Sequence, residues 1–113
     1  MKETIPLIYP VRVEEIPDFL DSASRGARYW CSNELGFESQ AKLALTENGV
    51  EVFDTEGDKE TKFILNRTSI ARGLNAMMTN EIKHFADFVT GDYDETTGDV
   101  FLQCCLFGEV IYS

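Results

Sequence analysis

Carboxylates are the side chains of this sequence whose number and spacing could support chemistry. The chain of 113 residues carries 20 aspartates and glutamates against 10 lysines and arginines, which gives a formal net charge of −10. Residues 47–60 and 81–99 are densely acidic, and each stretch contains one lysine. Closely spaced carboxylates can bind a cation, exchange protons with a substrate, or present a row of negative charges as phosphates do.

The spacing of the acids does not favour a metal site. Residues 92–99 begin like a calcium loop, which has glycine at its sixth position and a bidentate glutamate at its twelfth. Here the glycine is Gly98, at the seventh position, and the twelfth residue is Gln103. The acidic residues 54–60 lack the same features. We therefore expect no metal ion in either segment.

Three cysteines and one histidine give equally little support for zinc binding or nucleophilic catalysis. Cys31, Cys104, Cys105 and His84 show no C-x-x-C or C-x-x-H spacing. On a helix, the adjacent Cys104 and Cys105 would point about 100° apart. We expect buried cysteines, a partly exposed histidine, no catalytic residue and no cofactor, so the chain is not predicted to be an enzyme.

Charge and cysteine usage also indicate a setting and a class of partner. A net charge of −10 opposes direct binding to nucleic acid or to an anionic membrane, and it favours a basic groove on another protein. The odd cysteine count, with two adjacent residues, is typical of a reducing compartment rather than of a disulfide scaffold. With no recognisable signal peptide and no apolar run of about 18 residues, we expect a cytoplasmic protein, monomeric or homodimeric.

The elements that must position these residues are predicted from periodicity and turn residues. In the first half we expect an extended segment over 1–13 and a helix over 16–25 with Gly26 as its C-cap. A strand over 27–31, a loop over 32–40 and a hairpin of strands 42–46 and 50–54 follow. Asn48-Gly49 is the hairpin signal, and 61–65 adds a further strand.

The second half has helical periodicity. A helix capped by Asn66 or Thr68 is predicted to reach residue 78, and a second, capped by Thr79 or Asn80, to end at Gly91. A third helix, capped by Thr96 or Thr97, is expected over 97–107. It is apolar nearly all round and should therefore lie in the middle of the core. Residues 110–112 are expected to add an edge strand.

Together these elements predict one domain, residues 1–113, of the α+β class. We expect a small antiparallel sheet of three to four strands with three to four helices packed on one face. With 43% hydrophobic and 12% aromatic residues, the chain has enough apolar side chains for a core of this size.

The acidic stretches are then the candidate contact surface for a protein partner. Carboxylates held on a rigid frame can imitate a phosphate ladder and be captured by arginines and lysines that normally hold nucleic acid. The alternative is that the negative charge only keeps the protein soluble and binds no partner. Phe37 and Tyr93 are candidate aromatic anchors. The predicted partner-binding residues are Glu47, Glu51, Asp54, Glu56, Asp58, Glu60, Asp92, Tyr93, Asp94, Glu95 and Asp99.

Two apolar motifs carry a resemblance. An early G-x-x-Y-W element, Gly26 to Trp30, and a closing Q-x-x-L-F-G-E-x-x-Y element, Gln103 to Tyr112, resemble those of small bacteriophage and prophage accessory proteins without assigned function. Cys104, Cys105 and the final serine depart from that pattern. The motifs themselves are interpreted as core-packing signatures rather than as a site.

The resemblance implies a phage setting inside a bacterial host, where small acidic proteins often block host defences. Our hypothesis is an inhibitor of a nucleic-acid-handling defence protein, of the anti-CRISPR or anti-restriction type, with DNA mimicry as one way in which it could act. One alternative is a phage structural or assembly protein that forms an oligomer. Another is a small enzyme that uses its carboxylates.

Overall fold

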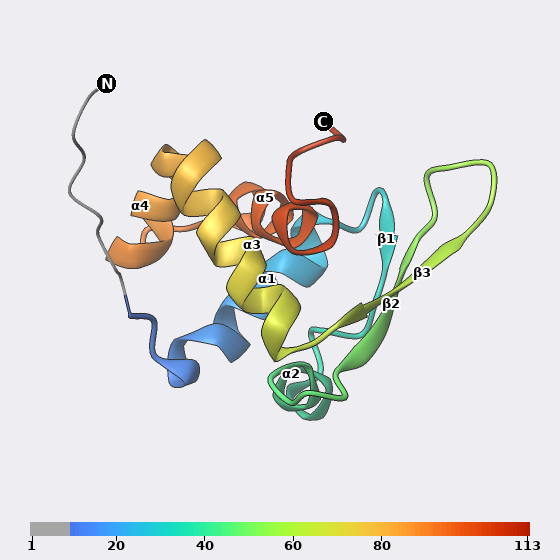
Figure 1. Ribbon diagram of the computed structural model, residues 1–113, viewed down its shortest axis with the longest axis horizontal. Coiled ribbons are helices and arrows are strands. Elements are labelled where there is room, and N and C mark those ends of the chain that lie inside the picture. The colour runs from blue at the N-terminus through green and yellow to red at the C-terminus, as the bar shows by residue number, and fades with distance from the viewer. Residues whose placement is uncertain (1–9) are drawn as a thin grey trace, which may run out of the picture.

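The described residues form a three-stranded antiparallel sheet and five α-helices, which confirms the predicted α+β class. Figure 1 shows the computed structural model, which describes residues 10–113. In chain order the elements are the 3-10 helix η1 (Val13–Glu15), α1 (Ile16–Gly26), β1 (Cys31–Ser32), α2 (Glu38–Ala44), β2 (Val50–Asp54), β3 (Thr61–Leu65), α3 (Arg67–Asn80), α4 (Ile82–Thr90) and α5 (Glu95–Phe107). None of the helices described is long and apolar enough to cross a bilayer.

Helix α5 is the centre of the core, as its apolar composition predicts. It is buried continuously from Thr97 to Cys105 and packs chiefly against α1 and α3. Glycines allow these close approaches: a Cβ at Gly98 would overlap the backbone of Ala23 in α1, and a Cβ at Gly73 would overlap Cys105. Gly26 was predicted as a C-cap, but it is the last residue of α1 and lies against the backbone of Glu95.

The sheet has the strand order β1-β2-β3, and β2 pairs with β3 over its whole length, from Val50↔Leu65 to Asp54↔Thr61. Strand β2 alternates between buried and exposed side chains, with Val50 and Val52 inside. Helices α1, α3, α4 and α5 lie together in Figure 1, and the β2–β3 hairpin extends away from them.

Two of the helix ends predicted from the sequence are confirmed here. Asn66 caps α3, with reciprocal hydrogen bonds to Ser69, and Gly91 ends α4 in the left-handed conformation. Two predicted caps are wrong. The N-cap of α4 is Glu81, with no side-chain hydrogen bond, and α5 begins at Glu95 because Asp94 is its cap.

The strands predicted over 50–54 and 61–65 are confirmed as β2 and β3, and the other strand predictions fail wholly or in part. Residues 38–44 form helix α2, so neither the predicted loop over 32–40 nor the predicted strand over 42–46 is correct. The observed hairpin turns through residues 55–60, and Gly49, at φ +67°, only leads into β2. Residues 27–30 are turns, with β1 limited to Cys31–Ser32, and 110–112 form no strand. Of the segment predicted as extended, residues 1–9 lie outside the described residues, and Val13 belongs to η1.

Candidate functional site

An exposed group of carboxylates lies in the loop that joins β2 to β3. We define the acidic loop as residues 55–60, all of which are exposed. It carries Glu56, Asp58 and Glu60 with a single base, Lys59. Within residues 10–113, no ion pair involves any of these three acids. Figure 1 shows the loop at the outer end of the hairpin, where a partner could approach it without meeting the helices.

The base of the acidic loop is held firmly to the body of the protein. The backbone N–H of Thr55 donates to the carbonyl of Trp30 at 2.8 Å, and its hydroxyl reaches the same oxygen at 3.2 Å. The N–H of Glu56 donates to Oδ1 of Asp54 at 3.0 Å. The loop therefore presents its charges from an anchored hairpin.

Two neighbouring acids predicted for this surface are exposed, and both already have partners. Glu51 points out from β2, and Nζ of Lys62 lies 3.6 Å from its Oε1. Glu47 accepts a long hydrogen bond, 3.5 Å, from the hydroxyl of Thr68. They add negative potential around the hairpin, beside an acidic loop whose three acids join none of the ion pairs within residues 10–113.

Asp54 was predicted as part of the contact surface, and its burial corrects that placement. Only 9% of the residue is exposed. Its Oδ2 accepts from the hydroxyl of Tyr112 at 2.7 Å, and its Oδ1 accepts from the N–H of Glu56. Both oxygens are thus used inside the protein, and the side chain fixes the hairpin rather than facing a partner.

Most acids of the second predicted group, residues 92–99, already have partners within the protein. Asp94 caps α5, and the N–H and hydroxyl of Thr97 hold the pKa of this carboxyl below its usual value. Oε1 of Glu95 lies 3.0 Å from Nε of Arg25, which also pairs with Asp21. Asp92 is exposed and joins none of the ion pairs among the described residues.

Asp99, also predicted for the contact surface, is a buried acceptor at the centre of a polar network. Its Oδ1 accepts from the indole Nε1 of Trp30 at 2.7 Å and from Nε2 of Gln103 at 3.0 Å. Its Oδ2 accepts from the hydroxyl of Tyr29 at 2.7 Å. A buried carboxylate that meets three donors stabilises the fold, and its charge is not available to a partner.

The two aromatic anchors predicted from the sequence lie in different environments. Phe37 is 66% exposed, so an anchoring role remains a prediction. Tyr93 is half-buried, with its ring 4.8 Å from Phe19 and 6.3 Å from Phe88 between centroids. It packs against the core cluster, which corrects its assignment as an exposed anchor.

Sequence reasoning missed how Gln103 holds the end of the chain. The side chain is fully buried, and its Oε1 accepts from the backbone N–H groups of Ile111 and Tyr112 at 2.7 and 2.8 Å. Its Nε2 also donates to the carbonyl of Tyr112 at 3.1 Å. The closing motif contained the signal, a glutamine inside an apolar run. Its interpretation as a packing element agrees with these contacts.

The thiols are in environments that suppress nucleophilic chemistry. Burial raises the pKa of Cys31 and of Cys104 to about 11, and it raises the pKa of Cys105 well above its ordinary value. All three cysteines are buried and free, as expected. At neutral pH they stay protonated, which is the unreactive form. His84 is half-buried, and its Nδ1 has no hydrogen-bond partner among the described residues.

A surface cavity of about 540 Å³ lies beside the Asp99 network, between α1, α5 and the end of the chain. Burial and the hydrogen bond to Asp99 raise the pKa of Tyr29 to about 12, and the hydrogen bond to Asp54 raises that of Tyr112 to about 12. Both phenols therefore act as hydrogen-bond donors near neutral pH. In residues 10–113, no cluster of three or more His, Cys, Asp or Glu side chains is arranged to hold a metal.

Comparisons of the chain with protein-family models, with curated proteins and with solved structures found no match.

Proposed function

We propose that this protein is a non-enzymatic binder that uses its acidic loop to occupy a basic groove on a nucleic-acid-handling protein. The observation that supports this most directly is the set of three exposed acids, Glu56, Asp58 and Glu60, that join no ion pair within the described chain. They are carried at the outer end of an anchored hairpin on a chain of net charge −10.

Electrostatic steering would draw the acidic loop towards a basic groove. Single exposed ion pairs contribute only about 0–1 kcal/mol, so no one carboxylate would account for tight binding. Several carboxylates on one hairpin, backed by a strongly negative body, raise the association rate with a positively charged groove. Binding of this kind displaces the anion that normally fills the groove, which makes the protein a competitive inhibitor.

A host defence protein is the partner class we propose. Proteins of the CRISPR and restriction type hold nucleic acid in basic channels, where they contact its backbone through arginines and lysines. The resemblance of the two apolar motifs to phage accessory proteins supports this setting. The proposed inhibitor acts by stoichiometric binding inside a bacterial host, without a catalytic step.

The experiment is capture from a bacterial lysate on immobilised protein, followed by elution with duplex DNA. The proposal predicts retained proteins that DNA releases and that rising salt also releases. The triple variant Glu56→Lys, Asp58→Lys and Glu60→Lys should retain little of this fraction. The matched control is Glu15→Lys, Glu34→Lys and Glu109→Lys, which changes the net charge equally at exposed positions outside the acidic loop.

A second candidate, an assembly protein that forms an oligomer, is favoured by an apolar face on α4. Ile82 and Val89 are 62% and 37% exposed, and their spacing places them on the same face of that helix. Sedimentation separates the candidates. A discrete oligomer at low protein concentration that Ile82→Glu dissolves would support assembly, and a monomer would support the acidic binder.

A further inference from the structure

An apolar groove of about 250 Å³ lies along helix α3, on a part of the molecule that the acidic loop does not reach. Its floor is one face of α3, contributed by Ile70, Ala71, Leu74 and Met78. In the part of the chain that the structure describes, its other walls come from three separate segments, which supply Val11, Val13, Ile16, Leu45 and Phe85. A groove built from so many elements is a formed feature of the fold rather than a gap beside one side chain.

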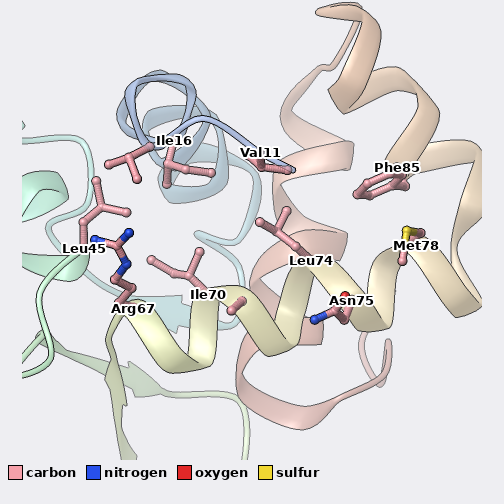
Figure 2. A pocket seen from close by; sticks show the side chains of 11 residues that line it. Val11, Ile16, Leu45, Arg67, Ile70, Leu74, Asn75, Met78 and Phe85 are labelled. Atoms are coloured by element: carbon pink, nitrogen blue, oxygen red, sulfur yellow. The ribbon is translucent and has the colours of Figure 1, made fainter. Parts of the chain in front are cut away.

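Among residues 10–113, only two polar side chains line this groove, and one of them carries a charge. Arg67, the first residue of α3, lies beside Leu45 at one end, and Met78 and Phe85 lie at the other end (Figure 2). Asn75 lies between them on the same helix. Arg67 is exposed, and none of the ion pairs within residues 10–113 uses it, although the chain has twice as many acids as bases.

The length of the groove matches a ligand of moderate length. At about 1.5 Å per residue, Arg67 and Met78 are about 16 Å apart along the axis of α3. A ligand with its charge at Arg67 would therefore run along the apolar floor toward Phe85. Because Arg67 is the only charged group among the described residues that line the groove, a ligand that is apolar along its body and anionic at one end fits this lining best.

A peptide fits this lining poorly. An extended peptide carries N–H and C=O groups along its length, and each needs a partner once it is removed from water. The groove offers the side chains of Arg67 and Asn75, while the backbone of α3 is already bonded within the helix. An alkyl chain has no N–H or C=O groups that need a hydrogen-bond partner.

We propose that the α3 groove binds a medium-chain fatty acid, with the carboxylate at Arg67 and the alkyl chain over Ile70 and Leu74. Arg67 supplies a guanidinium that can hold a carboxylate through two hydrogen bonds. The apolar walls supply the larger part of the affinity, as in most small-ligand sites. This site is separate from the acidic loop, so its failure would leave the proposed function untouched.

The test is titration of the full chain with decanoate, below its micelle concentration, followed by amide chemical shifts. We expect saturable shifts at Ile70, Leu74 and Phe85, and about fourfold weaker binding for each methylene removed from the ligand. Arg67→Gln should weaken decanoate about fivefold. The matched control is Arg72→Gln, an exposed arginine of the same helix outside the groove, which should change nothing.

Three outcomes would overturn the proposal. The first is the absence of saturable shifts, or shifts spread over the whole surface. The second is equal binding of decyltrimethylammonium, because a cation should avoid Arg67. The third is movement of the groove signals with protein concentration alone, which would make the groove an interface between copies of the chain. The unfolding midpoint of Arg67→Gln, compared with wild type, shows that the variant is folded.

Discussion

The indole Nε1 of Trp30 donates to Oδ1 of Asp99 at 2.7 Å, across 69 positions of sequence. This contact joins the turn after α1 to the central helix α5 in the middle of the core. Trp30 is fully buried, and Asp99 is one of the few buried acids among the described residues. The pair explains why an acid in an acidic segment serves the fold rather than a partner.

Removing the carboxylate of Asp99 should destabilise the protein in a graded way. Asp99→Ala removes the acceptor of the Trp30 indole, of the Tyr29 hydroxyl and of one N–H of Gln103, and we expect a loss of about 3 kcal/mol in the free energy of unfolding. Asp99→Asn keeps one oxygen for the donors of Trp30 and Gln103 and should cost about 1–2 kcal/mol. Urea unfolding measures both values. Asp92→Ala, at an exposed position, should stay within about 0.5 kcal/mol of wild type.

Gln103 should control the order of the last residues. Gln103→Met removes the acceptor for the backbone N–H groups of Ile111 and Tyr112 while keeping an apolar side chain of similar length. We expect hydrogen exchange at these two amides to become much faster. The amide of Leu20, in the core of α1, serves as the internal reference. Unchanged protection of Ile111 and Tyr112 would show that other contacts hold the segment.

Tyr29 and Tyr112 should make stability fall at alkaline pH. Their pKa values are raised to about 12 from an ordinary value of 10.0, so the folded state holds these protons more tightly than the unfolded state. The resulting stabilisation is fully present below pH 10 and is lost as the pH rises towards 12. Urea midpoints across this range measure the loss. The double variant Tyr29→Phe and Tyr112→Phe should show a smaller alkaline decline than wild type.

The cysteines should react with thiol reagents only when the protein opens. Cys31 and Cys104 have pKa values raised to about 11, and all three thiols are buried. Labelling by an aromatic disulfide reagent near pH 8 should therefore be slow in the native protein and complete in denaturant. Rapid labelling of any one cysteine in the folded state would contradict this description of its environment.

The helices were predictable from the sequence where local signals and tertiary packing agree. Asn66 with Ser69 starts α3, and the glycines after α4 and α5 end those helices with positive φ. Helix α2 was missed because Leu43 and Leu45 alternate as in a strand and precede Asn48-Gly49. The structure instead buries Ala41 and Ala44, three positions apart, and leaves Leu43 exposed.

The candidate site was only partly predictable, because acids of the same type serve different purposes. Asp54 and Asp58 occur in one acidic stretch, yet the hydroxyl that fixes Asp54 comes from Tyr112, 58 positions away. Local composition carries no information about such a partner. The acidic loop itself, a run of polar residues between two strands, was visible in the sequence as exposed charge.

The central claim is that the acidic loop, rather than the total charge, binds a basic groove that otherwise holds nucleic acid. The most direct measurement is the affinity of a lysate protein that DNA elutes for three forms of this chain: wild type, a loop variant and a control variant. The loop variant carries Glu56→Lys, Asp58→Lys and Glu60→Lys. The control variant carries Glu15→Lys, Glu34→Lys and Glu109→Lys. We predict a loss of about a hundredfold or more for the loop variant, which exchanges attraction for repulsion at three contacts, and a loss below about tenfold for the control. Equal losses in the two variants, or none in the loop variant, would contradict the account.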